Sequence, residues 1–278
     1  MNKTLKVYYA KVPNMGDILN CNVIKECFGY DVVRRTYLTG EISGIGSGLG
    51  NYTYEGGAIK KTLKYLSGIL YPTVSIWGTG FISYKEKDDK FYKRNTHICA
   101  VRGELSKKRI EKIIGHTIDV PTGDAGILAS YLLKKEVKKR YSVGIIAHYK
   151  EQSEPVFQEM LNKYENSVYV DVTKTPEEVV NMIAQCETVI SSSLHGLIIA
   201  DSLRVPNIHL KVTDNLLGDG FKFDDYYSAY GLKHEYIEAA QVDKLTLKYI
   251  AEHYPITDGM VENKKKEMLE AFPYKPGR

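Results

Sequence analysis

A run of serines followed by a histidine is the stretch of this sequence whose residue types most directly suggest chemistry. Residues 191–196 read Ser-Ser-Ser-Leu-His-Gly, after an apolar run of strand length and at the start of a helical pattern. Hydroxyl groups and free N–H groups at a helix N-terminus form an anion site, and a histidine there can hold a phosphate or transfer a proton. The alternative is that the serines cap the helix and the histidine only packs. The candidate anion-binding residues are Ser192, Ser193, Leu194, His195 and Gly196.

Arg102 also stands where an apolar run passes into a helical pattern, in Val-Arg-Gly-Glu-Leu-Ser at 101–106. An arginine at the carboxyl end of a buried strand must find an anion, because an unpaired buried charge is costly. Its planar guanidinium suits a phosphate or a carboxylate. Two interpretations stay open: Arg102 binds a ligand, or it pairs with a local acid such as Glu104 or Asp124.

Two acids and two glycine-rich turns are further candidates. Asp17 follows the first apolar run, whereas Asp124 lies in Gly-Asp-Ala-Gly, where it could equally be a helix N-cap. The glycines within 44–48 and 78–80 end strand-like runs, where the backbone could approach a ligand closely. Neither turn is a GxGxxG or GxxxxGK[ST] motif, and no HExxH, GxSxG or kinase signature occurs, which argues against a Rossmann dehydrogenase or a P-loop enzyme.

The elements that must position these residues alternate between strand-length apolar runs and helical periodicities, the pattern of a parallel α/β protein. In the first half the pattern predicts strands at 5–10, 73–78 and 97–103, helices at 18–28 and 103–115, and a short helix from 124. A second alternation predicts strands at 141–149, 167–172, 188–193 and 206–212 and helices at 154–164, 176–186 and 194–203. Ligands of such sheets bind at the carboxyl ends of strands, where the candidate residues stand.

We therefore predict two doubly wound lobes, residues 1–138 and 139–240. Helices at 241–253 and 259–271 belong to a C-terminal segment, 241–278, that we expect to pack back on the first lobe.

Composition limits the function classes. Hydrophobic residues make up 43% and charged residues 26% of the chain, as in ordinary globular proteins. No apolar run has the length of a signal peptide or membrane span, so we expect a cytoplasmic protein. The four cysteines lack CxxC or Cys/His spacing, which argues against a zinc site and a disulfide framework. A net charge of +4 suits an anionic substrate but predicts no nucleic-acid partner.

In this order, the motifs resemble those of the polysaccharide pyruvyl transferase family. The matching stretches are NMGD at 14–17, IGS at 45–47, WGTGF at 77–81, VRGELS at 101–106, GDAGIL at 123–128, GIIAHY at 144–149, SLHGL at 193–197, ADSL at 200–203 and KFDDYY at 222–227. Ala125 stands where the family commonly has proline, which removes no functional group.

The resemblance implies two Rossmann-like lobes similar to those of GT-B glycosyltransferases, with the active site in the cleft between them. It implies no bound cofactor, phosphoenolpyruvate as co-substrate and donor, and a hexose hydroxyl pair as acceptor; the products are a pyruvate ketal and phosphate. By the same resemblance, Arg102 and His195 belong to the donor site. The residues placed on the acceptor side are Asn14, Asp17, Gly46, Ser47, Gly78, Thr79 and Gly80.

Ketal formation on an enol phosphate needs a proton at the vinyl carbon, which creates a cation-like centre for a hydroxyl to attack. We hypothesise that His195 supplies this proton, and that Arg102 with Ser192, Ser193 and backbone N–H groups holds the phosphate and carboxylate. Asp17 or Asp124 would be the base for the acceptor hydroxyl. The sequence shows no metal-ligand cluster, so we predict no obligatory metal.

Two alternatives share this architecture. A GT-B glycosyltransferase would use a nucleotide-sugar donor and need acids in the second lobe; Glu177 and Glu178 are available but are explained by the dipole of the helix they open. The other is an inactive, sugar-binding relative. If the acceptor is lipid-linked, for example to undecaprenyl, the protein would work at the inner face of the membrane through peripheral contact. No motif in the sequence indicates the oligomeric state.

Overall fold

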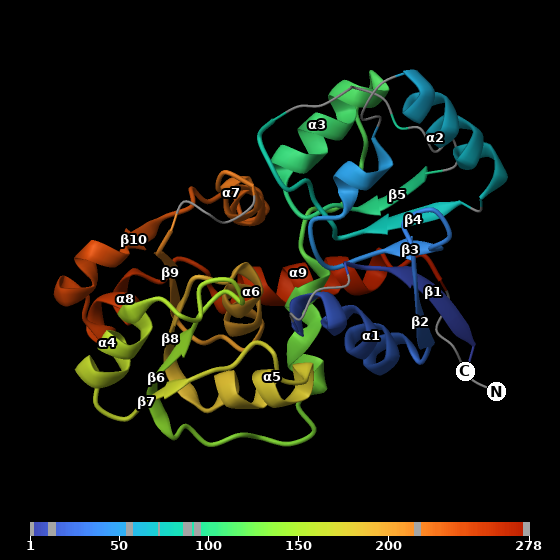
Figure 1. The fold of residues 1–278 in the computed structure, drawn as a ribbon. Helices are drawn as coiled ribbons and strands as arrows, with labels where there is room; N and C mark the ends of the chain where they lie inside the picture. The colour runs from blue at the N-terminus through green and yellow to red at the C-terminus, as the bar shows by residue number, and fades with distance from the viewer. Residues whose placement is uncertain are drawn as a thin grey trace.

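The computed structural model describes residues 3–10, 15–53, 58–71, 73–85, 91, 96–213 and 218–274, without the side chains of residues 60, 61, 64, 67 and 68. Within these ranges the chain forms two lobes, each built on a five-stranded sheet whose strand pairs are all parallel (Figure 1).

The first lobe contains the sheet β2-β1-β3-β4-β5. Its strands are β1 (Thr4–Tyr8), β2 (Asp31–Arg35), β3 (Ile42–Ser43), β4 (Val74–Trp77) and β5 (Thr96–Ala100). Its helices are α1 (Met15–Phe28), the 3-10 helix η1 (Leu49–Tyr52), α2 (Ala58–Leu70) and α3 (Glu104–Ile114). The 3-10 helix η2 (Ala125–Leu132) follows and leads toward the second lobe.

The second lobe contains the sheet β10-β9-β8-β6-β7. Its strands are β6 (Tyr141–Ile146), β7 (Ser167–Tyr169), β8 (Cys186–Ser191), β9 (Asn207–Lys211) and β10 (Tyr236–Glu238). Its helices are α4 (Pro155–Lys163), α5 (Pro176–Ala184), α6 (Leu194–Ser202), the 3-10 helix η3 (Ala239–Lys244) and α8 (Leu247–His253).

Both sheets have the same connectivity. When β6 is counted as the first strand of its lobe, each sheet follows the order 2-1-3-4-5, the order of flavodoxin-like doubly wound proteins. The chain reverses its winding direction between β1 and β3 in the first lobe and between β6 and β8 in the second. Ligands of open α/β sheets bind at such switch points, beyond the carboxyl ends of the strands.

Two helices that follow second-lobe strands in the sequence contact the first lobe. Helix α7 (Phe221–Ser228) follows β9, yet its Phe221 packs in a first-lobe hydrophobic cluster with Tyr52 and Phe81. Helix α9 (Asp258–Glu270) lies behind both lobes (Figure 1). Its Met268 carbonyl accepts a hydrogen bond of 2.9 Å from Nε1 of Trp77.

The hydrophobic core is continuous across the two lobes. A single cluster joins Val7, Ile42 and Trp77 of the first lobe to Ile146 and Val189 of the second. Because burial of apolar area is the main stabilising contribution, the two sheets depend on one shared core.

The expected α/β class and the two lobes with parallel sheets are confirmed. The periodicity analysis did not identify six elements that the structure contains: β2, β3, η1, α2, α7 and β10. The expected helix at 241–253 is divided into η3 and α8, because Leu245 ends η3 in extended backbone and Thr246 caps α8. No described helix is long and apolar enough to cross a membrane.

Candidate active site

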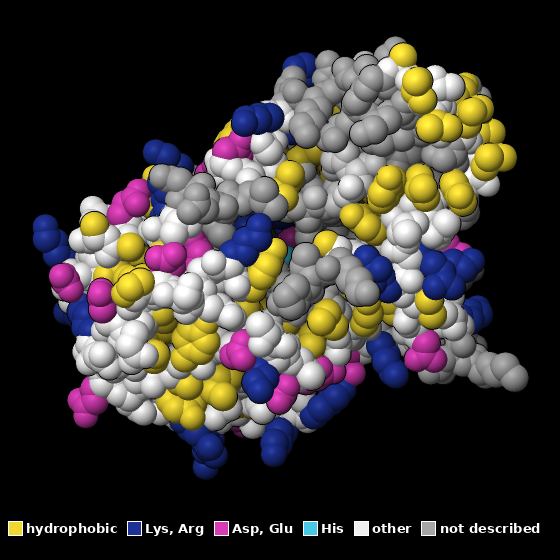
Figure 2. All heavy atoms as spheres, in the orientation of Figure 1, with side chains coloured by type: hydrophobic (Ala, Val, Ile, Leu, Met, Phe, Trp, Pro, Cys, Tyr) yellow, Lys and Arg dark blue, Asp and Glu magenta, His cyan; other side chains and the backbone are white. Residues whose placement is uncertain are grey.

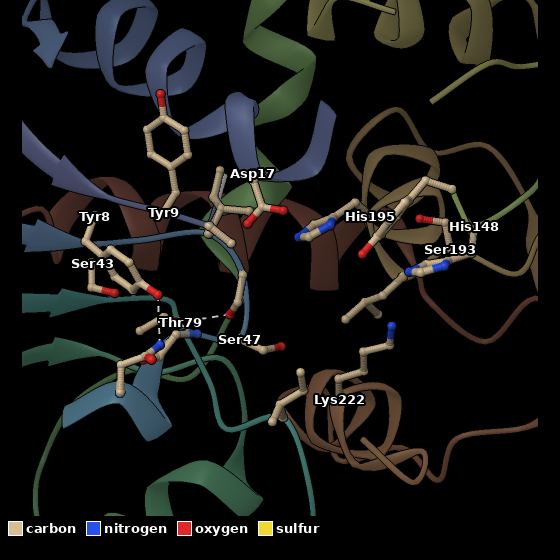
Figure 3. Close-up of a pocket in the computed structure, with 18 of the residues that line it drawn as sticks. Tyr8, Tyr9, Asp17, Ser43, Ser47, Thr79, His148, Ser193, His195 and Lys222 are labelled. Atoms are coloured by element: carbon tan, nitrogen blue, oxygen red, sulfur yellow. Dashed lines mark hydrogen bonds between the residues drawn. The ribbon is translucent and has the colours of Figure 1, made fainter. Parts of the chain in front are cut away.

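A pocket of about 300 Å³ lies between the two lobes, where the switch points of the two sheets face each other (Figure 3). The first lobe contributes Tyr8, Tyr9, Ala10, Asp17, Ser43, Ile45, Gly46, Ser47, Gly48, Asn51, Thr79 and Ile82. The second part of the chain contributes His148, Tyr149, Lys150, Ser193, Leu194, His195 and Lys222. Most of these residues directly follow the carboxyl ends of strands, where α/β proteins bind ligands.

His195 is in the first turn of α6, and it lines the pocket. Nε2 of its ring is buried and has no hydrogen-bond partner among the described residues. Burial, followed by the positive charges of Lys222 and Arg102, lowers the pKa of His195 to about 3. The His195 ring is therefore neutral at physiological pH.

Helix α1 approaches His195 so closely that only glycine fits at position 16. A Cβ atom on Gly16 would lie 2.0 Å from Nδ1 of His195. The neighbouring Met15 N–H donates a 2.9 Å hydrogen bond to the carbonyl of Val172 in the second lobe. The start of α1 is thus fixed against the second lobe and confines the His195 ring.

The three serines before α6 have different roles. Ser191 Oγ accepts a hydrogen bond from the Ser193 N–H at 3.0 Å, and Ser192 Oγ accepts one from the His148 N–H at 2.9 Å. These two hydroxyls therefore shape the turn before α6, which differs from the helix capping considered as the alternative interpretation of the motif. Ser193 is the N-cap residue, but its side chain makes no capping hydrogen bond. Its hydroxyl and the start of α6 are thus exposed to the pocket, which is a geometry that favours an anion.

Lys222 points into the pocket from α7 (Figure 3). Burial and the nearby charge of Arg102 lower its pKa to about 8, an effect that Glu151 and Asp17 partly offset. Among the described residues, we find no hydrogen bond or ion pair to its ammonium group. At neutral pH the pocket therefore contains a mostly protonated amine beside the start of α6.

Arg102 is fully buried and does not line the pocket. Its Nε donates to Asp225 Oδ2 at 3.0 Å, its Nη1 donates to Ser47 Oγ at 2.7 Å, and its Nη2 donates to the carbonyl of Phe81. The acid that it pairs with is Asp225 of α7, rather than Glu104 or Asp124. Arg102 therefore fixes α7 and Ser47, and through them the wall of the pocket.

Only one of the two candidate acids faces the pocket. Asp17 lies in the first turn of α1, with its carboxyl group directed toward the His195 ring (Figure 3). Burial raises the pKa of Asp17 to about 7. Asp124 instead caps η2 by accepting a 2.8 Å hydrogen bond from the Gly126 N–H, and it does not line the pocket. Burial raises its pKa to about 7 as well.

Main-chain groups form much of the first-lobe wall. The loop after β3, residues 44–48, is held by Asn20, whose Oδ1 accepts a 2.9 Å hydrogen bond from the Ile45 N–H. Thr79 Oγ1 donates to the Gly46 carbonyl at 3.0 Å and accepts from the Gly48 N–H at 3.0 Å. Three of the candidate acceptor residues thus line the pocket beside Asp17: Gly46, Ser47 and Thr79.

The remaining acceptor-side candidates lie elsewhere. Gly78 and Gly80 are not among the lining residues, and Gly80 packs so closely on Arg102 that a Cβ would lie 2.6 Å from Cζ of that side chain. Asn14 lies outside the described residues.

Several lining residues had no assigned role in the sequence analysis. They include Tyr8, Tyr9, Asn51, Ile82, His148, Tyr149, Lys150 and Lys222. Tyr8, Tyr9, His148 and Tyr149 lie at or just after the carboxyl end of β1 or β6. Their position after a predicted strand was therefore the sequence signal that could have identified them. Lys222 lies in the KFDDYY stretch already noted, but no pattern distinguished it from other surface lysines.

Comparison with known proteins identifies the family of this chain. The sequence profile of the polysaccharide pyruvyl transferases matches residues 40–215. The chain belongs to the polysaccharide pyruvyl transferase family. An uncharacterized protein of Acanthamoeba polyphaga mimivirus is 30% identical over 207 residues, which cover 70% of this chain and 69% of that protein.

Among solved structures, an uncharacterized protein of Klebsiella pneumoniae subsp. pneumoniae is similar over 84% of this chain and 93% of its own chain, with 15% identity and a TM-score of 0.49. The matched residues of this pyruvyl transferase family member include the loop after β3 and the His195 motif. Two facing walls of the pocket therefore lie within the matched region. In the described part of the chain, no group of three His, Cys, Asp or Glu side chains is suited to a metal ion.

Proposed function

We propose that this protein transfers pyruvate from phosphoenolpyruvate to two hydroxyl groups of a hexose, forming a pyruvate ketal and releasing phosphate. The hexose belongs to a polysaccharide or to its precursor, free or lipid-linked. The observation that carries the proposal is a single pocket that contains a lysine without an ion-pair partner among the described residues, the open start of α6 and a buried imidazole.

The donor is assigned to the second-lobe wall. The Ser193 hydroxyl and the N–H groups at the start of α6 suit a phosphate or carboxylate. Lys222 supplies the positive charge that we first assigned to Arg102, whose own charge is paired with Asp225. Arg102 then acts as a positioning residue, since it holds α7 and Ser47 in place.

Proton transfer is assigned to His195 and Asp17. His195 donates a proton to the vinyl carbon, one acceptor hydroxyl adds to the adjacent carbon, and Asp17 takes the proton of that hydroxyl. The second hydroxyl then closes the ketal, and its proton leaves with the phosphate. Burial and, to a smaller extent, the charges of Lys222 and Arg102 lower the pKa of His195; a bound anionic donor offsets these charges and therefore favours the protonated ring.

The acceptor is assigned to the first-lobe wall. Tyr8 and Tyr9 supply aromatic surface, and Ser47 and Thr79 supply hydroxyl groups. Asn51 donates a 2.8 Å hydrogen bond to the Tyr8 hydroxyl, which fixes that ring. A few placed polar groups on an apolar lining are typical of a small-molecule site.

The proposal is tested by phosphate release from phosphoenolpyruvate with a panel of galactosides, mannosides and glucosides. Wild type is compared with His195→Ala and Lys222→Met, and with Lys233→Met as a control on an exposed lysine. We expect acceptor-dependent release by wild type and control, and a loss of about 100-fold or more for His195→Ala. No release with any acceptor, together with thermal stabilisation by a nucleotide sugar, would instead support a glycosyltransferase.

A further inference from the structure

Helix α2 presents its large apolar side chains to solvent. Ile59 is 80% exposed, Leu63 62%, Leu66 49%, Ile69 51% and Leu70 80%. We call these five residues the α2 face. Figure 2 shows hydrophobic side chains gathered over this part of the first lobe, at the upper right. None of the five belongs to a hydrophobic core cluster.

The α2 face is a continuous strip. Residues 59, 63, 66 and 70 are spaced by three or four positions, so their side chains share one side of the helix. In a crossover helix of an α/β protein this side normally packs on the sheet. A contiguous exposed apolar patch on a soluble protein marks an interaction site.

The charge of α2 indicates what it binds. Its 13 residues, 58–70, include three lysines, at 60, 61 and 64, and no acidic residue. At 100° per residue, these three positions fall beside and behind the strip of residues 59, 63, 66 and 70, and none falls within it. A helix with lysines on one side and large aliphatic residues on the other is typical of segments that lie in the interfacial layer of a membrane, where anionic lipids attract the lysines.

We propose that α2 docks the protein onto an anionic lipid surface. The contact is peripheral, and the apolar residues of the α2 face enter the layer between headgroups and acyl chains. A second copy of the chain fits less well, because α2 carries no acid that could pair with the lysines of a second α2.

Docking through α2 is also compatible with access to the pocket. A crossover helix runs antiparallel to the strands it connects, so the Ile59 end of α2 lies toward the carboxyl edge of β4. Thr79, two residues beyond β4, lines the pocket at that edge. The proposed surface and the first-lobe wall of the pocket therefore belong to the same lobe.

The test is co-sedimentation with vesicles of phosphatidylglycerol and phosphatidylcholine, against vesicles of phosphatidylcholine alone. Wild type should sediment with the anionic vesicles and stay in solution with the neutral ones. The double variant Leu63→Glu/Leu70→Glu should reduce partitioning by about tenfold or more, because it removes two inserted side chains. Tyr249→Glu is the matched control, since this 39% exposed residue lies on α8 of the second lobe.

The proposal is overturned if wild type remains in solution with anionic vesicles, or if the double variant sediments like wild type. It is also overturned in favour of self-association if light scattering shows a wild-type dimer that the double variant loses. An unchanged melting temperature of the double variant shows that the fold is retained. The readout needs neither donor nor acceptor, so it is independent of the proposed activity.

Discussion

The partners of each charged side chain, more than its residue type, decide what it can do in this pocket. Arg102 and Lys222 lie close enough for the charge of one to lower the pKa of the other. Arg102 is neutralised by Asp225 at 3.0 Å, whereas the described residues offer Lys222 no such partner. A buried charge in an ion pair is compensated within the protein, whereas a desolvated single charge attracts a ligand of opposite charge.

Lys222 predicts how donor binding depends on pH. The anion is bound by the protonated amine, so affinity should fall as pH rises through about 8, the pKa of Lys222, beyond the effect of Asp17, which ionises near pH 7. Lys222→Arg should abolish this fall, because arginine stays charged up to about pH 12. Isothermal titration calorimetry with phosphoenolpyruvate between about pH 6.5 and pH 9.5 measures the affinity of wild type and of Lys222→Arg. Identical pH profiles for the two proteins would show that Lys222 does not bind the anion.

Residue types at strand ends predicted part of the candidate site. His195, Ser193, Asp17, Ser47 and Thr79 all line the pocket; Ser47 lies in a glycine-rich turn, and the other four follow apolar runs in the sequence. The ion pair between Arg102 and Asp225 was not predictable from the sequence. These residues are 123 positions apart, and they meet only because α7 packs on the first lobe. The same packing brings Lys222 into the pocket.

Among the elements, the contact between the starts of α1 and α6 is the most sensitive to substitution. Gly16→Ala should push the His195 ring away, because its new Cβ would lie 2.0 Å from Nδ1. A displacement of about 1 Å can cost roughly 100-fold in turnover. We therefore expect kcat for phosphate release to fall by about that factor, with a smaller change in the donor Kd, since Lys222 is not displaced.

Gly50→Ala is the control for this substitution. Nothing lies within 4 Å of a Cβ at Gly50, so its kcat should match wild type. If Gly16→Ala retained wild-type turnover, the confined position of His195 would be irrelevant to catalysis.

The elements that sequence periodicity predicted are those whose burial follows a simple pattern. Strands β4, β6 and β8 and helices α3 to α6 have long apolar runs or clear helical spacing. Strand β3 has two residues, too few to form a pattern. Helix α7 combines polar residues with Phe221 and Phe223, which are buried against different clusters. Tertiary contacts, rather than a local repeat, stabilise such segments.

At the scale of the whole molecule, the shared core predicts that the two lobes unfold together. The only tryptophan, Trp77, is fully buried in the first lobe and belongs to the cluster that extends to β8 of the second. Its fluorescence therefore reports the first lobe, while far-UV circular dichroism reports both lobes. We expect the two urea unfolding curves to coincide.

Phe272 tests the role of the C-terminal segment in this cooperativity. Its ring stacks on Phe28 at 3.6 Å and contacts Trp77 edge-on. Phe272→Ala should lower the free energy of unfolding by about 3 kcal/mol and move both curves together. The exposed-site control Tyr249→Ala should change it by about 0.5 kcal/mol or less. Separation of the fluorescence curve from the dichroism curve in wild type would contradict a shared core.

The loop after β3 has a consequence for how new substrate preferences can arise. It presents main chain to the pocket, and a Cβ on Gly44 would lie 2.5 Å from Oδ1 of Asn20, the residue that holds the loop. Point mutations in this loop thus disturb its scaffold before they change what the pocket recognises. Diversification is left to the side chains around it, above all Tyr9 and Ile82, which line the pocket without holding that loop.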